Sequence, residues 1–142
     1  MNQEKLEQLF KKYEKAFSKL EFEKIAELYP DTFISAGPKG TIAQNKNDFL
    51  NKAKQASEFY KSIGQSSAKI LSKSELPISN DYTMVTVHWG VTFEKTGDKV
   101  IQFDVSYIVQ ETGKEPKIIL FITHQDEEEA MKKLGLQPQL QN

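Results

Sequence analysis

Apolar and polar residues alternate along two neighbouring stretches of the chain, 82–93 and 100–110. A period of two places successive side chains on opposite faces of a β-strand. The apolar positions are Val85, Val87, Trp89, Val91 and Phe93 in the first stretch, and Ile101, Phe103, Val105, Tyr107 and Val109 in the second. We therefore predict two long strands, each with one buried face.

These two strands are predicted to form an antiparallel hairpin around Gly97. A three-residue loop with this glycine in the left-handed region sets Lys95 opposite Lys99 and Trp89 opposite Val105, so that apolar residues pair with apolar residues. A two-residue loop would shift the register by one residue and mix the two faces, which excludes it.

Two further stretches extend the predicted sheet into an antiparallel meander. Residues 117–124 form a nearly unbroken apolar run, which predicts a strand buried on both faces. Residues 67–76 alternate only weakly, and Pro77 follows them. This pattern is typical of the outermost strand of a sheet.

Three helices are predicted ahead of the meander, because apolar residues recur at three- and four-residue spacing. They span residues 4–20, residues 22–29 and a third stretch that Asn45 or Asn47 caps and Gly64 ends. A short strand over 31–36 and a turn over 37–40 lie between the second and third helices. At the other end of the chain, the acidic run 126–129 opens a predicted short helix that ends at residues 134–135.

This order of elements resembles the nuclear transport factor 2-like superfamily, which includes SnoaL-like and ketosteroid-isomerase-like proteins. The resemblance rests on the paired helices over 6–29, the strand and Gly-Pro turn that begin at residue 31, the third helix, and the ending 117–126. It implies an α+β cone, in which three N-terminal helices pack on a bent antiparallel sheet around a deep cavity. The domain would cover residues 1–136, with a frayed tail over 137–142. Such folds serve isomerases, dehydratases, cyclases, hydrolases and binding modules, so the fold alone does not set the function.

Composition narrows the function classes. The 142 residues suit one domain, and 19 basic and 20 acidic residues give a net charge of −1, spread along the chain. We therefore expect neither a nucleic-acid nor a membrane partner. All basic residues are lysine, which disfavours bidentate capture of an anionic substrate, and the absence of cysteine excludes thiolate chemistry. The N-terminal residues lack the apolar core of a signal peptide, so we expect a cytoplasmic protein.

Polar residues on the sheet offer a possible catalytic set. The predicted register places His88 opposite Ser106 and diagonal to Asp104, so a Ser, a His and an Asp lie close together. No nucleophile elbow or oxyanion hole accompanies them. We interpret them as the polar surface of the sheet, facing solvent or a second subunit.

The evidence for a metal site at the end of the last strand is also weak. His124, Asp126 and Glu127 supply potential ligands from one segment. A helix cap and first-turn acids explain the same carboxylates without a metal. We expect no metal and no cofactor.

An aromatic stripe at helical or strand spacing fits either simple core or the wall of a ligand pocket. If the apolar face of the hairpin faces the helices, a flat slot is walled by Tyr13, Phe17, Trp89, Phe103 and Tyr107, with His124 at its mouth. This arrangement predicts a small-molecule-binding domain for a neutral hydrophobic ligand. The alternative is an isomerase or lyase for a neutral hydrophobic substrate, with His124 or the Asp104–His88 pair as the proton carrier. The partly apolar outer face of the sheet predicts a homodimer.

Overall fold

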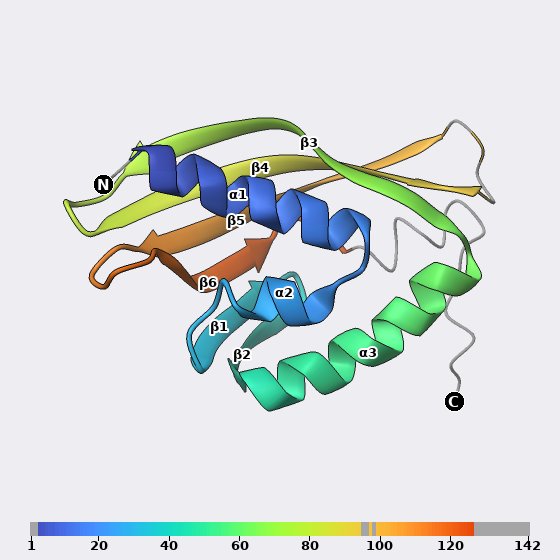
Figure 1. Ribbon diagram of the computed structural model, residues 1–142, viewed down its shortest axis with the longest axis horizontal. Coiled ribbons are helices and arrows are strands. Elements are labelled where there is room, and N and C mark those ends of the chain that lie inside the picture. Colours follow the sequence, from blue (N-terminus) through green and yellow to red (C-terminus); the bar gives the residue numbers. More distant parts are fainter. Residues whose placement is uncertain (1–2, 95–96, 98, 127–142) are drawn as a thin grey trace.

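The computed structural model describes residues 3–94, 97 and 99–126 (Figure 1). Its helices are α1 (Gln3–Ser18), α2 (Phe22–Ala26) and α3 (Lys46–Ser62). Its strands are β1 (Thr32–Gly37), β2 (Gly40–Asn45), β3 (Gln65–Pro77), β4 (Tyr82–Phe93), β5 (Val100–Gln110) and β6 (Lys117–Thr123). The short helix predicted after residue 126 and the tail 137–142 lie outside the described residues.

The six described strands form one sheet in the order β2-β1-β6-β5-β4-β3. Strands β3 to β6 make the predicted antiparallel meander, with β3 at its edge. The sheet as a whole is mixed, because β1 runs parallel to β6. Strand β2 was not predicted, and it pairs with β1 as a hairpin across the Gly-Pro turn.

The predicted register of the central hairpin is wrong by two residues. Trp89 lies opposite Phe103, not Val105, and the last pair of the ladder is Thr92 with Val100. Gly97 has the expected positive φ of 62°. A slip of two residues keeps every side chain on its face, so the alternating pattern cannot detect it.

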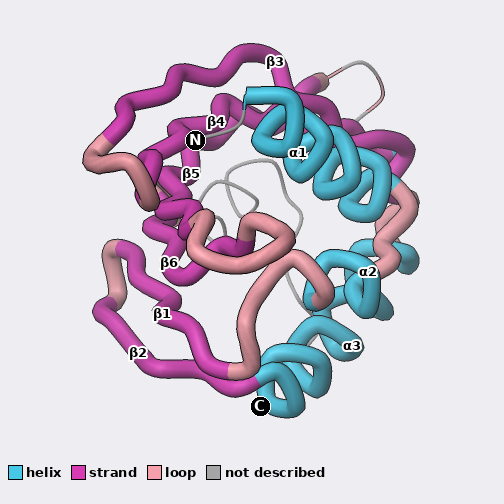
Figure 2. The backbone as a smooth tube through the Cα atoms, turned by 60° about the vertical axis from the view of Figure 1, so that its left-hand side comes forward, coloured by secondary structure: helices cyan, strands magenta, loops and turns pink. Residues whose placement is uncertain are grey.

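The helices cover one face of the sheet, which we call the inner face, and the sheet curves toward them (Figure 2). Together they form the expected α+β cone. Val85, Val87 and Trp89 on this face of β4 are 0% exposed. They pack with Leu6 and Phe10 of α1 in one hydrophobic core. The outer face is more open: Ile122 of β6 is 41% exposed, so the prediction that β6 is buried on both faces is wrong.

The start of α3 follows directly from its sequence. The Asn45 side-chain oxygen accepts a hydrogen bond from the Asp48 backbone N–H at 2.9 Å, which confirms the predicted N-cap. At its other end, Gly64 takes a left-handed conformation with φ 73° and its N–H donates to the Lys61 carbonyl. Both ends of α3 are therefore defined by local hydrogen bonds. The helix lies below α2 in Figure 1.

Among the described residues, no helix is both long enough and apolar enough to cross a lipid bilayer.

Candidate functional site

A cavity of about 270 Å³ lies between the inner face of the sheet and the three helices. It is near the lower end of the roughly 300–1,000 Å³ that small-molecule sites occupy, which suits a ligand of one or two rings. The lining residues are Tyr13, Phe17, Phe22, Ile25, Gln44, Phe49, Lys52, Ala53, Ala56, Tyr60, Trp89, Phe103, Val105, Tyr107, Phe121 and Thr123.

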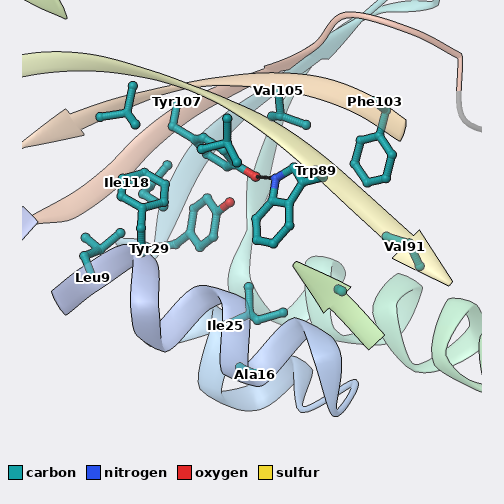
Figure 3. Close-up of a cluster of buried hydrophobic side chains, with 14 of the residues drawn as sticks. Leu9, Ala16, Ile25, Tyr29, Trp89, Val91, Phe103, Val105, Tyr107 and Ile118 are labelled. Carbon is teal, nitrogen blue, oxygen red and sulfur yellow. Dashed lines mark hydrogen bonds between the residues drawn. The ribbon is translucent and has the colours of Figure 1, made fainter. Parts of the chain in front are cut away.

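Trp89 and Tyr107 form the sheet side of this cavity (Figure 3). The Trp89 indole Nε1–H donates a hydrogen bond to the Tyr107 hydroxyl at 2.9 Å, and the two residues are 0% and 3% exposed. The rings of Tyr13 and Phe17 reach the indole from α1, with centroid distances of 5.6 and 5.2 Å. The polar tip of the tryptophan is therefore satisfied inside an otherwise aromatic wall.

A second polar pair joins two tyrosines. The hydroxyls of Tyr13 and Tyr29 lie 2.9 Å apart, and Tyr29 is 0% exposed. Burial raises the pKa of Tyr29 well above its ordinary value, and the nearby tyrosines add to the shift. The Tyr29 phenol is accordingly neutral at physiological pH and acts as a fixed hydrogen-bonding group.

Five of the six residues predicted for the site do line the cavity: Tyr13, Phe17, Trp89, Phe103 and Tyr107. His124 does not. Its Nε2 lies 2.7 Å from the Ser106 hydroxyl, on the outer face of the sheet. The reason is the alternation of β6: Thr123 points into the cavity, so the residue after it is directed to the other side.

Several lining residues were missed, and for most of them the sequence carried a usable signal. Phe49, Ala53, Ala56 and Tyr60 belong to the apolar stripe that predicts the third helix. Helix α3 was recognised, but nothing in its own pattern shows that it packs over the same space as Trp89. Gln44 carried no such signal, because β2 itself was not predicted.

The cavity opens on one side into a larger hollow between α3 and the β1–β2 hairpin. Lys52, Ala56, Tyr60, Phe121 and Thr123 line both spaces and so mark the mouth. Of the described residues around the inner cavity, Lys52 alone carries a charge, and none is an acid or a histidine. The described part of the wall therefore provides aromatic surface and hydrogen-bonding groups, with Lys52 as its one charged side chain.

The polar set suggested by the sequence lies on the outer face. His88 stands directly opposite Asp104, with Nδ1 2.7 Å from the carboxylate, and its Nε2 lies 2.7 Å from the Gln102 side-chain oxygen. The hydrogen bonds with Gln102 and Asp104 raise the pKa of His88, and the hydrogen bond with His88 lowers the pKa of Asp104. Thr86, not His88, is opposite Ser106, because of the two-residue shift in register.

This outer group does not form a nucleophilic site. The Ser106 hydroxyl is shared between Thr86 at 2.9 Å and His124 at 2.7 Å, and His88 faces away to Asp104 and Gln102. Serine, histidine and aspartate are thus split between two separate hydrogen-bonded groups, Thr86–Ser106–His124 and Gln102–His88–Asp104. They do not make the continuous chain of a Ser-His-Asp triad.

Comparison with solved structures shows the same architecture in several proteins. An NTF2-like protein of unknown function from Shewanella oneidensis MR-1 superposes with a TM-score of 0.71 at 17% identity, covering 88% of this chain and all (100%) of that one. The β subunit of benzoate 1,2-dioxygenase from Burkholderia mallei gives 0.67 at 11% identity, covering 91% and 93%. A ketosteroid isomerase-like protein from Erwinia carotovora atroseptica gives 0.62 at 15% identity, covering 87% and 97%. At these identities the likeness shows the fold alone.

Sequence comparison adds the family. No curated protein matches the chain. A family model described as "NTF2-like protein (DUF6841)" matches residues 3–126, which include every described helix and strand. The chain therefore belongs to the NTF2-like protein (DUF6841) family.

Proposed function

We propose that this protein is a small-molecule-binding domain whose inner cavity takes a compact, uncharged, hydrophobic ligand. The observation that carries the proposal is the wall of the cavity: aromatic rings from α1, α3, β4, β5 and β6 surround about 270 Å³. A ligand of one or two rings would bury most of its surface there, which is the main source of affinity for such compounds. A cytoplasmic location, expected from the sequence, stays a prediction.

The lining favours binding over catalysis. An isomerase or lyase of this fold needs an acid or base within hydrogen-bond reach of the substrate. Both proton carriers considered from the sequence, His124 and the Asp104–His88 pair, lie on the outer face of the sheet. The described cavity wall offers amide, hydroxyl and ammonium groups in their place.

Filling part of the cavity should weaken binding. Ala56 lines both the cavity and its mouth, so we expect Ala56→Phe to weaken binding of decahydro-2-naphthol, a neutral two-ring alcohol, by about tenfold or more. Trp89 is the only tryptophan, and the probe does not absorb at the wavelengths that excite tryptophan. A saturable shift in Trp89 emission therefore measures the dissociation constant.

The matched control is Lys54→Phe, which adds the same ring to an exposed position of α3 that does not line the cavity. This variant should bind like the unmodified protein. Unchanged affinity in Ala56→Phe would place the ligand elsewhere. If the unmodified protein shows no saturable shift, the proposed function is wrong.

We also propose that two copies associate through the outer face of the sheet. Ile122 is 41% exposed there, and Met84, Ile108 and Leu120 are only partly buried, so the face combines apolar and polar surface. Light scattering at micromolar concentration should give about twice the 16.3 kDa mass of one chain. Ile122→Lys should return the mass to that of a monomer, whereas Ile42→Lys, on the β1–β2 hairpin, should not. A monomeric mass for the unmodified protein would contradict the association.

A further inference from the structure

Among the residues that the structure describes, Gln44 is the one amide side chain in the wall of the cavity. It comes from β2 and is 8% exposed. Its side-chain oxygen is buried and has no hydrogen-bond partner in the part of the chain that the structure describes. A buried acceptor without a donor is rare, because it has lost its water and gained nothing in return.

The position of Gln44 explains why no protein group reaches it. In the β1–β2 pairing it stands opposite Phe33, which is 2% exposed and packs against Tyr29 and Phe49. Its nearest surroundings are thus aromatic rings. Three other donors of the wall already have partners: the Trp89 indole N–H and the Tyr107 hydroxyl bond to each other, and the Tyr13 hydroxyl bonds to that of Tyr29. The Thr123 hydroxyl donates to the Ala36 carbonyl.

Two other buried side-chain oxygens without a partner in the described residues differ from that of Gln44. Gln65 borders a space of only about 20 Å³, too small for a ligand, and its amide nitrogen is already bonded to the Phe17 carbonyl. Glu21 lies at the surface, where its side chain is 34% exposed and pairs with Lys24. Glu21 also borders a hollow, of about 640 Å³, but that space is lined largely by lysine and glutamate side chains. Among the described residues, Gln44 is thus the one whose unused neutral acceptor belongs to the aromatic cavity.

We infer that Gln44 is the polar anchor of the cavity, and that it selects cyclic ligands carrying a hydrogen-bond donor, such as an alcohol, a phenol or an amide N–H. This inference rests on the proposed function and adds a chemical requirement to it. The aromatic wall holds the ring, and the Gln44 oxygen accepts the ligand's O–H or N–H. A ligand with only an acceptor at that position would leave two acceptors facing each other, which costs affinity.

A pair of probes tests the requirement without any substitution. Decahydro-2-naphthol donates a hydrogen bond, whereas 2-methoxydecalin has the same rings and can only accept one. In the unmodified protein the alcohol should bind about five- to tenfold more tightly than the ether, by titration of the single Trp89 emission.

Gln44→Leu then tests whether the Gln44 side chain causes the preference for a hydrogen-bond donor. Leucine removes the acceptor and keeps an apolar side chain of similar bulk, so the alcohol-to-ether affinity ratio should fall to about one, with the ether bound as well as before or better. The melting temperature should be unchanged or higher, because an unsatisfied acceptor is lost. Gln44→Met provides the same test with an unbranched side chain.

The control is Thr123→Val, which removes a different neutral polar group of the wall. The Thr123 hydroxyl already donates to the Ala36 carbonyl at 3.4 Å. The substitution should leave the ratio intact. A ratio that collapses in Thr123→Val and survives in Gln44→Leu would overturn the inference, as would equal affinities or a preference for the ether in the unmodified protein. These results would leave the proposed function standing, whereas failure of both probes to bind would refute both.

Discussion

Replacing Trp89 with alanine is expected to lower the free energy of unfolding by about 3–5 kcal/mol, the range seen when a large aromatic residue is removed from a core. The indole is 0% exposed and contacts the rings of Tyr13 and Phe17. The substitution would also leave the Tyr107 hydroxyl without its 2.9 Å donor. Because the only tryptophan is lost, urea unfolding should be followed by far-ultraviolet circular dichroism.

Two comparisons sharpen this result. Leu76→Ala removes a large apolar side chain that is 57% exposed, so the change in unfolding free energy should stay within about 0.5 kcal/mol. Trp89→Phe keeps an aromatic ring and should fall between the other two variants. A loss of less than about 1 kcal/mol in Trp89→Ala would show that the indole is not at the centre of the core.

The second large effect is expected at Gly64, where α3 turns into β3. Gly64→Ala should lower the free energy of unfolding by about 2–4 kcal/mol, from the cost of a left-handed residue and the cost of overpacking together. The φ of 73° disfavours any side chain, and an added Cβ would lie 2.9 Å from the Glu94 Cβ. That carbon is fixed to the backbone, whose N–H donates to the Gly64 carbonyl at 2.7 Å, so it cannot rotate away.

Gly97→Ala separates the two contributions at Gly64. Gly97 also has a positive φ, 62°, but an added Cβ there would meet nothing within 4 Å. Its substitution should therefore cost only the conformational part, about 1–2 kcal/mol. Urea unfolding followed by Trp89 fluorescence gives the free energy of unfolding of each variant. Equal losses in the two variants would show that the contact with Glu94 contributes nothing.

The fold was largely predictable because its main signals are local. Alternation assigned Trp89 and Tyr107 to the same face, and the structure shows that this face is the one buried under the helices. Asn45 was one of two caps that residue type and position predicted for α3, and the structure selects it over Asn47. The order of these elements was sufficient to identify the resemblance that the family match to residues 3–126 confirms.

The errors come from features that local patterns do not contain. A slip of two residues between β4 and β5 leaves the same side chains on each face. The alternating pattern therefore cannot show that Trp89 lies opposite Phe103, and the register becomes visible only in the folded structure. The parallel pairing of β1 with β6 joins segments far apart in the sequence, and no alternation within either strand specifies its neighbour.

The same division holds for the candidate site. Alternation and helical spacing grouped the aromatic residues on apolar faces, because large apolar side chains favour burial. These residues are Tyr13, Phe17, Trp89, Phe103 and Tyr107, and the structure shows that they line a cavity. Only the tertiary structure decided that His124 belongs to the outer face and that Gln44 belongs to the cavity. Burial of large apolar side chains follows from their own transfer from water, whereas the surroundings of a polar side chain depend on which distant strands and helices pack beside it.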